Sequence, residues 1–438
     1  MSEVGLTSWG RIHRFAHDVV RPAWLEDLPH ALSGPGPKLA YGLGRSYGDS
    51  CLNEGGTLVV TRALNRFRDA DWHTGVITCE AGVSLAELLT VAVPRGWMLP
   101  VTPGTKQVTI GGAVANDVHG KNHHREGTFG SHVQSFELIR TDGQRYGCSP
   151  TEHEDLFRAT IGGLGLTGVI MTVTLRLKRA SPFIIQEAVR FRSLAEFITL
   201  SAASDQDYEY TVAWIDATAS GKDLGRGIFF RGNHAADDPK LRPLHRTGML
   251  RVPVECPSWM LNRYSVKAFN MGYERVAGWT ARPHKVHYDP FFYPLDQVQH
   301  WNRIYGRGGF YQYQLVVPRG RETELERIMI AIAASGLASF LAVLKVFGSA
   351  ASPGLLSFPQ PGYTLALDFQ NRGRATLDLF RRIDAIVAES GGRLYPAKDS
   401  HMSSSMFKTG YANNLGAFQK WRDPGLSSSF WRRVMGHD

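Results

Sequence analysis

The sequence predicts an α+β fold of two domains. At 438 residues the chain is longer than a single hydrophobic core usually supports. Its 46 glycines cluster, above all between Leu99 and Gly130. Near Pro182 the sequence pattern changes to longer helical and strand runs with fewer glycines. Strands and helices of the second half follow a βαββαβ order, which is typical of an antiparallel sheet with helices on one face.

The charge and cysteine content narrow the class of protein. A net charge of +9 and a pI near 9.4 suit nucleic acid, an anionic membrane surface or a phosphorylated ligand. The basic residues are dispersed, so we favour the last two over nucleic acid. No CxxC pair is present, which argues against a zinc ribbon or a disulfide framework and fits a reducing compartment. The four cysteines are Cys51, Cys79, Cys148 and Cys256.

In the first half, short expected strands are separated by glycines. Thr57–Val60 and Gly75–Glu80 are expected strands, because they are short β-rich runs between turn residues. A helix is expected after Ser84, since Ser84 and Glu87 have capping-box spacing ahead of two leucines, and Pro94 and Gly96 end it.

After the glycine-dense stretch, Glu137–Thr141 is an expected strand and Asp142-Gly143 the turn of a hairpin. Glu154–Thr160 is an expected short helix, and Val169–Leu177 alternates as a long strand does. Between them, GGLGLTG matches GxGxxG. The dinucleotide fingerprint requires the strand first, so we interpret this segment as a tight helix-to-strand turn.

The second half ends in the clearest pattern of the chain. The expected elements, in order, are strand Gln312–Val317, helix Arg321–Ser335, strand Phe340–Phe347, strand Thr364–Phe369, helix Ala375–Glu389 and strand Arg393–Tyr395. Residues 219–294 are basic, aromatic and weakly periodic, so we expect partly mobile loops there that face a membrane or cover a site.

Two glycine-rich segments suggest a site for a polyanionic ligand. Leu99–Gly130 contains adjacent Gly111 and Gly112 followed by small residues, and Tyr41–Ser50 reads YGLGRSYGDS. Glycine lets a ligand approach the backbone closely, and successive N–H groups bind anions. Arg45 could add a fixed positive charge.

Together with AGVSLAELL and TIGGAVA, these segments resemble the FAD-binding domain of the vanillyl-alcohol-oxidase (PCMH-type) flavoprotein superfamily. Within it, GRSYGDS, PGTKQVTIGGAVANDVHGKNHH, GGLGLTG, FYQYQLVVP, LKVFG and GGRLYPAKDS resemble the branch that oxidises polyprenyl-phosphoryl ribose. The match covers about Tyr41 to Ser400 and is loosest between 180 and 290. We therefore expect an FAD-binding domain over 10–180, a substrate domain over 181–390, and a C-terminal segment, 391–438, that returns to the FAD domain.

The resemblance also implies which residues contact FAD. Segments 40–50 and 109–112 would wrap the pyrophosphate, and the other residues would contact the rest of the cofactor. Some superfamily members carry a covalently flavinylated histidine where Tyr47 stands, so we expect noncovalent FAD. The expected cofactor-binding residues are Ala40, Tyr41, Gly42, Leu43, Gly44, Arg45, Ser46, Tyr47, Gly48, Asp49, Ser50, Gly104, Thr109, Ile110, Gly111, Gly112, Asn116, Asp117, Val118, His119, Ile170 and Tyr395.

A polar sheet face is the expected substrate wall. Gln312 and Gln314 share one face of their strand, as Lys345 and Phe347 do on another. Such a face suits a phosphorylated sugar, although a solvent-exposed face would show the same pattern. The resemblance places the substrate there, and adds Tyr305 and Lys398 to the expected substrate-binding residues.

The catalytic candidates are His119, Tyr47 and Lys398. His119 is placed slightly ahead as the base, because imidazole titrates near neutrality. A cation at Lys398 would stabilise the negative charge of a reduced flavin. His119, His123, His124 and His132 could suggest a metal site, but the interspersed glycines argue against a helix that would align them, and we expect no metal.

The expected reaction is oxidation of the 2-hydroxyl of a polyprenyl-phosphoryl-β-D-ribose, with an NADH-dependent keto-sugar reductase completing an epimerisation to arabinose. A sugar-lactone or other alcohol oxidase on the same scaffold is the alternative, as is a non-catalytic nucleic-acid or membrane-binding protein. Where some relatives carry a cysteine, Ala366 stands, so a thiol-directed modification of the site is in doubt.

The sequence also bears on the cellular location of the protein. We see neither a signal peptide nor an apolar stretch long enough to span a bilayer. We expect a cytoplasmic protein or one peripheral at the inner membrane, and the periplasmic face stays open.

Overall fold

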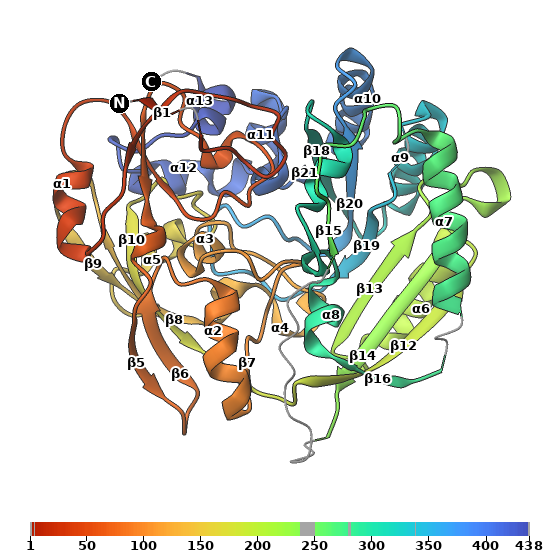
Figure 1. Ribbon diagram of the computed structural model, residues 1–438, viewed down its shortest axis with the longest axis horizontal. Coiled ribbons are helices and arrows are strands. Elements are labelled where there is room, and N and C mark those ends of the chain that lie inside the picture. The colour runs from red at the N-terminus through yellow and green to blue at the C-terminus, as the bar shows by residue number, and fades with distance from the viewer. Residues whose placement is uncertain (1, 4, 237–249, 279–281, 338, 437–438) are drawn as a thin grey trace.

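The computed structural model describes residues 2–3, 5–236, 250–278, 282–337 and 339–436. They form two halves that lie side by side (Figure 1). One half is built around two sheets from the first part of the chain, and the other around one larger sheet. The last helices pack against the first half. The expected α+β class is confirmed.

A four-stranded sheet begins the first half. Its order is β1-β2-β4-β3, and β4 pairs in parallel with both β2 and β3. The expected strand Thr57–Val60 is β4, and its Leu58 and Val59 are fully buried. The other elements here are β1 (Ser2–Glu3), β2 (His17–Val20), β3 (Lys38–Tyr41) and helix α1 (Leu28–Leu32).

A five-stranded antiparallel sheet completes the first half, in the order β5-β6-β10-β8-β9. The hairpin expected at Asp142-Gly143 joins β8 to β9. The strands are β5 (Phe67–Asp71), β6 (Val76–Glu80), β8 (Val133–Ile139), β9 (Arg145–Cys148) and β10 (Val169–Arg176), beside a small pair of β7 (Trp97–Met98) and β11 (Lys178–Arg179).

Local signals set the helices of this half. Ser84 Oγ accepts from Glu87 N at 3.2 Å and the Glu87 carboxylate accepts from Ser84 N at 2.8 Å, which confirms the capping box. The GGLGLTG segment joins a helix to a following strand, so the rejection of a dinucleotide fingerprint is also confirmed. The helices are α2 (Leu85–Ala92), α3 (Ile110–Ala115), α4 (His123–Glu126) and α5 (Glu154–Thr160).

The second half is one eight-stranded antiparallel sheet in the order β16-β12-β14-β13-β19-β20-β18-β21. The expected βαββαβ order is confirmed as β18–α9–β19–β20–α10–β21. Its strands are β12 (Phe183–Phe191), β13 (Tyr210–Ile215), β14 (Gly227–His234), β16 (His284–His287), β18 (Phe310–Pro318), β19 (Ala342–Phe347), β20 (Gly362–Gln370) and β21 (Arg393–Leu394).

Helices cover both faces of this sheet unequally. One face packs against α6 (Leu194–Ser204), α9 (Glu322–Ser335) and α10 (Arg374–Glu389) in the largest core. The other face is turned towards the first half. At β12 and β14 it is covered by α7 (Arg263–Gly278), whose Tyr273 ring lies 4.9 Å from the Trp214 ring.

The expectation of loops over 219–294 is wrong for much of that segment. It contains β14, the helix α7, β16 and the short helix α8 (Tyr288–Phe292), as well as β15 (Leu250–Arg251), which pairs in parallel with β17 (Val298–Gln299). The pattern misled because α7 buries few residues, chiefly Val266 and Asn270, and leaves several apolar side chains exposed. Residues 237–249 lie outside the described part.

The last three helices are α11 (Ser404–Gly410), α12 (Ala412–Trp421) and α13 (Ser429–Met435). They return to the first half, where α12 contacts α5 and α13 contacts the 3-10 turn Asp49–Cys51. None of the helices in the described ranges is long and apolar enough to cross a bilayer.

Candidate active site

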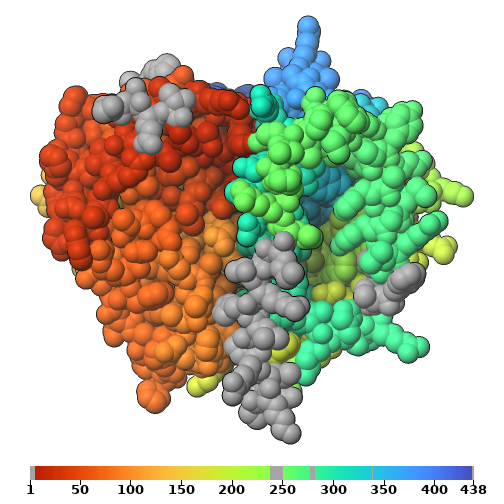
Figure 2. Space-filling view, in the orientation of Figure 1, coloured from red at the N-terminus to blue at the C-terminus, as the bar shows by residue number. Residues whose placement is uncertain are grey.

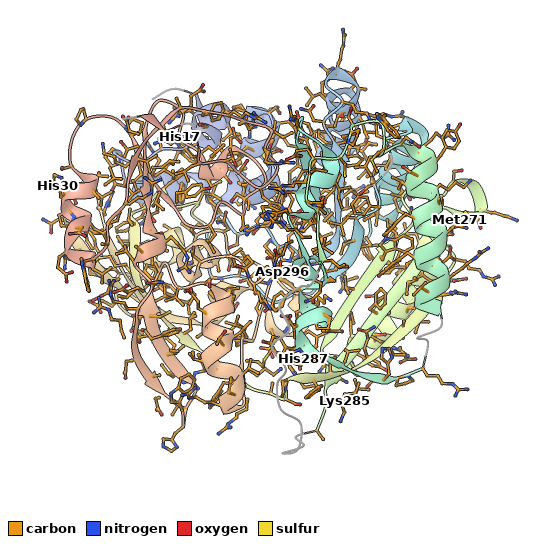
Figure 3. All side chains as sticks on the ribbon, viewed as in Figure 1. His17, His30, Met271, Lys285, His287 and Asp296 are labelled. Carbon is orange, nitrogen blue, oxygen red and sulfur yellow. The ribbon has the colours of Figure 1, made fainter. Side chains whose placement is uncertain are left out.

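A cavity of about 1040 Å³ lies between the two halves. It is lined by the glycine-rich loops of the first half, by strands β13, β18 and β19 of the large sheet, and by residues 289–301. Asp296, from the last of these segments, lies at the boundary between the halves (Figure 3). The two segments that the sequence singled out, the glycine loops and the glutamine-bearing strand, therefore share one space.

At the glycine end of this cavity, Gly42 and Gly44 have no room for a side chain. A Cβ on Gly42 would come within 2.4 Å of Thr109 Oγ1, and Gly44 has φ +61. Arg45 Nε and Ser50 Oγ are buried there with no hydrogen-bond partner among the described residues. A cation and a hydroxyl left unsatisfied beside bare backbone fit a ligand that carries phosphates. The residues present therefore fit FAD.

Most expected cofactor residues line this cavity, and they come from both glycine segments. The ones that line it are Ala40, Gly42, Leu43, Gly44, Arg45, Ser46, Tyr47, Ser50, Gly104, Thr109, Gly111, Gly112, Asn116, Val118, His119, Ile170 and Tyr395.

Five others lie behind the wall. Tyr41 donates to Thr7 O at 2.8 Å, Ile110 is in the core, and Asp117 accepts from Gly130 N and Ser357 Oγ. A Cβ on Gly48 would lie 1.5 Å from Asp399 O. Asp49 pairs with Arg433. These five hold the loops in place rather than facing the cavity.

The sheet wall is polar as well as buried. Gln312 and Gln314 are 7% and 5% exposed, so their strand face is not the solvent face considered from the sequence. Both line the cavity with Lys345. Phe347 and Tyr305 do not line it: Phe347 packs 4.8 Å from the His119 ring, and Tyr305 stacks 4.2 Å from Phe310.

His119 connects the loop to this wall. Gln314 Nε2 lies 3.0 Å from the Nε2 of His119. Nδ1 lies 3.2 Å from Lys345 Nζ, which itself donates to Gly120 O at 3.3 Å. Burial and the Lys345 charge lower the pKa of His119 well below 6.5. The imidazole is thus neutral and a weak base, which removes the reason for placing it first.

Three partly buried amines line the cavity. Burial lowers the pKa of Lys121 to about 7, and burial together with the charges of Lys121 and Lys398 lowers the pKa of Lys345 to about 7. Burial also lowers the pKa of Lys398, against the opposing effect of Asp368. Each amine would regain its proton beside an anion, so the arrangement favours a negatively charged ligand. Lys121 was not among the residues singled out, although the motif HGKNHH contains it.

Lys398 lies beside the glycine loop. Its Nζ is 4.1 Å from the centre of the Tyr47 ring. Burial raises the pKa of Tyr47 well above 10 and also raises the pKa of Asp368, which accepts from Gln312 Nε2 at 2.6 Å. Tyr47 is therefore a neutral phenol at physiological pH.

A segment that sequence reasoning missed closes one side of the cavity. Asp296 accepts from Thr105 Oγ1 at 2.7 Å and from Lys106 N at 2.9 Å, and Lys106 also pairs with Asp289. These bonds hold residues 289–296 of the second half against the loop of the first. The sequence pointed towards this segment only through its basic, aromatic composition, from which residues 219–294 were expected to cover a site.

The other histidines of the glycine-dense stretch do not converge. His123 packs 4.5 Å from Phe347, whereas His124 Nε2 faces Tyr208 O and His132 Nε2 faces Glu126 O. In the described ranges no group of three or more His, Cys, Asp or Glu side chains could hold a metal ion.

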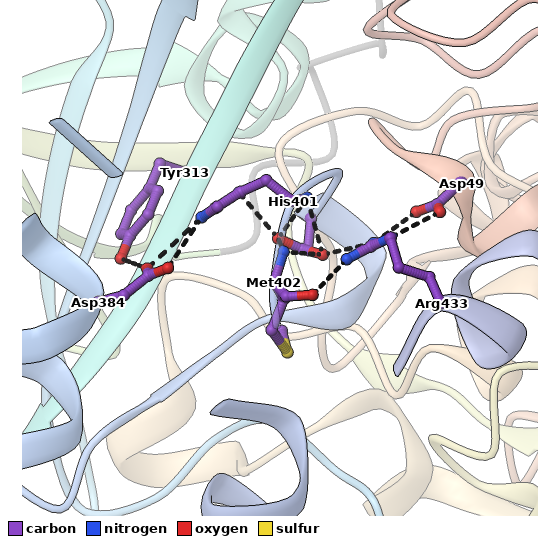
Figure 4. Close-up of polar contacts among 7 residues, drawn as sticks. Asp49, Tyr313, Asp384, His401, Met402 and Arg433 are labelled. Atoms are coloured by element: carbon purple, nitrogen blue, oxygen red, sulfur yellow. Dashed lines mark hydrogen bonds and ion pairs between the residues drawn. The ribbon is translucent and has the colours of Figure 1, made fainter. Parts of the chain in front are cut away.

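Behind Lys398, a charge network joins α10, β18 and α13 to the glycine loop (Figure 4). Arg433 of α13 donates to Asp49 and to Asp399 at 2.7–2.9 Å. His401 lies between Asp399, at 3.1 Å, and Asp384, at 3.3 Å. The two carboxylates outweigh burial and raise the pKa of His401 to about 9. Tyr313 donates to Asp384 at 2.5 Å.

Comparisons with known proteins agree with this site. The family described as FAD binding domain matches residues 31–149. The decaprenylphosphoryl-β-D-ribose oxidase of Mycolicibacterium smegmatis is 37% identical over 93% of this chain and 91% of its own length. An uncharacterised Streptomyces coelicolor protein is 31% identical over 75% of this chain and 92% of its own. An uncharacterised oxidoreductase of Rhodococcoides fascians is 27% identical over 50% and 52%.

The fold, the glycine-lined cavity and the FAD-binding match define an FAD-dependent oxidoreductase. More narrowly, the chain belongs to the family that includes the Mycolicibacterium decaprenylphosphoryl-β-D-ribose oxidase. The expectations of FAD as cofactor and of an enzyme that oxidises its substrate are thereby confirmed.

Proposed function

We propose that this enzyme oxidises the 2-hydroxyl of a polyprenyl-phosphoryl-β-D-ribose to a ketone. The observation that carries the proposal is the shared cavity, in which a phosphate-binding glycine end meets a wall of Gln312, Gln314 and Lys345. The name of the Mycolicibacterium relative supplies the sugar. The keto sugar would then pass to a separate NADH-dependent reductase, which completes the epimerisation to arabinose.

In this proposal the amines recognise the substrate phosphate. Lys121 and Lys345 are both partly buried, and both have lowered pKa values, so a phosphate beside them would restore their charge. The amides of Gln312 and Gln314 offer hydrogen bonds to sugar hydroxyls, which a purely apolar wall could not.

FAD is held without a covalent bond in this proposal, because Tyr47 offers no imidazole to the cofactor. When bound, FAD accepts the hydride of the substrate carbon. Arg45, Ser50 and the backbone of Gly42–Gly44 would bind the pyrophosphate. Lys398, beside Tyr47, would place a positive charge near the cofactor ring.

The same geometry narrows the choice of proton acceptor among His119, Tyr47 and Lys398. The pKa of His119 is too low for a strong base, and the pKa of Tyr47 is too high for a phenolate near neutrality. The lowered pKa of Lys398 brings its neutral form closer to neutral pH, so Lys398 is the candidate for holding the hydroxyl proton.

Anaerobic mixing of the yellow enzyme with a short-chain polyprenyl-phosphoryl ribose tests the proposal. The flavin absorbance should bleach, and simple sugars and sugar lactones should leave it unchanged. Bleaching by a lactone and not by the phosphoryl ribose would instead establish the lactone oxidase alternative. Acid precipitation should release all flavin into the supernatant, whereas flavin retained in the pellet would contradict noncovalent binding.

A further inference from the structure

An apolar surface lies beside the mouth of the cavity, which it reaches at Phe269. Of the thirteen large apolar residues exposed in the described chain, eight lie between 250 and 276. Exposed apolar side chains are normally scattered singly, so such a concentration marks an interaction site. We call these eight residues the rim: Leu250, Val254, Trp259, Met260, Tyr264, Phe269, Met271 and Val276.

Helix α7 presents half of the rim. Tyr264 and Met271 are seven residues apart and therefore lie on the same outer side of the helix, and Figure 3 shows Met271 on that helix. Tyr264 is 75% exposed and Met271 44%. The buried side of α7 carries Val266 and Asn270. Tyr273 and Phe269 pack toward the sheet, against Trp214 and Phe340, whereas the outer side of α7 with Tyr264 and Met271 stays exposed in the described chain.

The rim is continuous with the cavity. Phe269 and Tyr273 of α7 line it. In Figure 2 a hollow opens between the bright green residues that precede α7 and the helix itself, with the blue and teal strands of the large sheet at its floor. Anything seated on the rim would therefore lie at the entrance to the site.

Positive charge accompanies the rim. Residues 250–278 carry Arg251, Arg263, Lys267 and Arg275 against Glu255 and Glu274, and Glu255 is held by Arg11 at 2.5 Å. Lys267 and Arg275 have no ion-pair partner within the described ranges.

These two cations also line a second cavity, of about 580 Å³, beside Met271. Its three carboxylates, from Asp216, Asp223 and Glu274, all face Arg226, at 2.8, 4.0 and 4.0 Å. Arg190 lines this cavity as well, so its four cations (Arg190, Arg226, Lys267 and Arg275) outnumber its three acids by one, and this net positive charge lies next to α7.

We propose that the rim docks on the surface of a bilayer that contains anionic lipids. Tryptophan and tyrosine beside cations are the side chains that bind the boundary between head groups and acyl chains, and arginine and lysine add attraction to anionic lipid. This inference rests on the proposed function, since a polyprenyl-linked sugar is held in a membrane. Docking would bring the cavity mouth to the substrate head group while the polyprenyl chain stays in the lipid.

Flotation of the FAD-loaded enzyme with vesicles tests this surface. The enzyme should float with vesicles of phosphatidylcholine and phosphatidylglycerol, and less with phosphatidylcholine alone or at high salt. The substitutions Trp259→Ser, Tyr264→Ser and Met271→Ser together should lower the vesicle partition coefficient roughly tenfold. The matched control is Trp24→Ser with Ile330→Ser, whose side chains are 55% and 48% exposed on other surfaces and should leave partition unchanged.

Three outcomes would overturn the inference: equal partition into both kinds of vesicle, equal loss in the control, or a concentration-dependent dimer that the rim variant abolishes. The last would make the rim an interface between two copies of the chain. The rim variant should still oxidise a water-soluble short-chain substrate. If the wild type oxidises that substrate but does not float, the docking surface is wrong and the proposed function stands. If it does not oxidise the substrate, the proposed function itself fails.

Discussion

At the scale of single residues, Lys398 matters most, because its amine lies partly out of water beside the glycine loop. Its Nζ lies over the Tyr47 ring and it lines the cavity. A cation there favours the negative charge of a reduced flavin.

We therefore predict that Lys398→Met slows flavin reduction by substrate about 10²–10³-fold, which is the usual loss for one buried electrostatic contact. The flavin midpoint potential should become more negative, measured by dye-coupled reduction. Lys408→Met, at an exposed position of α11, is the control and should change neither value. An unchanged potential in Lys398→Met would show that this lysine only supports the fold.

The sequence led to some site residues and not to others for a physical reason. Gly42, Gly111 and Gln314 stand in local patterns, two glycine-rich segments and an alternating strand, and the structure places all three at the cavity. Lys121 and Asp296 carry no such pattern. Their significance comes from burial and from partners far along the chain, such as Thr105 for Asp296, and neither is visible before the chain is folded.

At the scale of elements, strong local signals gave accurate boundaries. β4 and α5 match the expected ranges, and the capping box of Ser84 fixed the start of α2. Helix α7 was missed because several of its apolar side chains face outward, so the rule that apolar periodicity marks a buried face did not apply.

The network around His401 links α10, β18 and α13, and its stability should depend on pH. The pKa of His401 in the folded protein, about 9, lies above the ordinary 6.5. The stabilisation of the fold by protonated His401 is therefore complete below pH 6.5 and is lost as the pH rises through 9. The difference corresponds to on the order of 3 kcal/mol.

We predict that His401→Gln is less stable than wild type by about that amount at pH 6, and that the gap narrows towards pH 10. Urea unfolding at several pH values measures it. His30→Gln, at an exposed position of helix α1, should show no gap (Figure 3). A gap that stays constant with pH would mean that His401 does not hold its extra proton in the fold.

At the scale of the whole molecule, the cavity exists only where the halves meet. Asp296 binds across the boundary, and α13 closes the back of the glycine loop through Arg433. We therefore propose that the segments 10–180, 181–390 and 391–438 are domains that depend on one another for FAD binding.

Calorimetry should then show one unfolding transition that FAD shifts upward as a unit. At an FAD concentration a thousand times the Kd, the added stability should be about 4 kcal/mol. Chains that lack 391–438 should fail to retain FAD through gel filtration. Two separate transitions, of which FAD moves only one, would show that the halves fold independently.

The methyl group of Ala366 has a consequence for inhibitor design, because it offers no nucleophile. Ala366 lies on the substrate wall, and the one cysteine that lines the cavity, in the described part of the chain, is Cys51 of the cofactor-side loop. Burial raises the pKa of Cys51 to about 12, which keeps its sulfur protonated and unreactive. Warheads that need a thiol should therefore fail to attach in this pocket, so blocking agents of that kind will have to rely on reversible affinity.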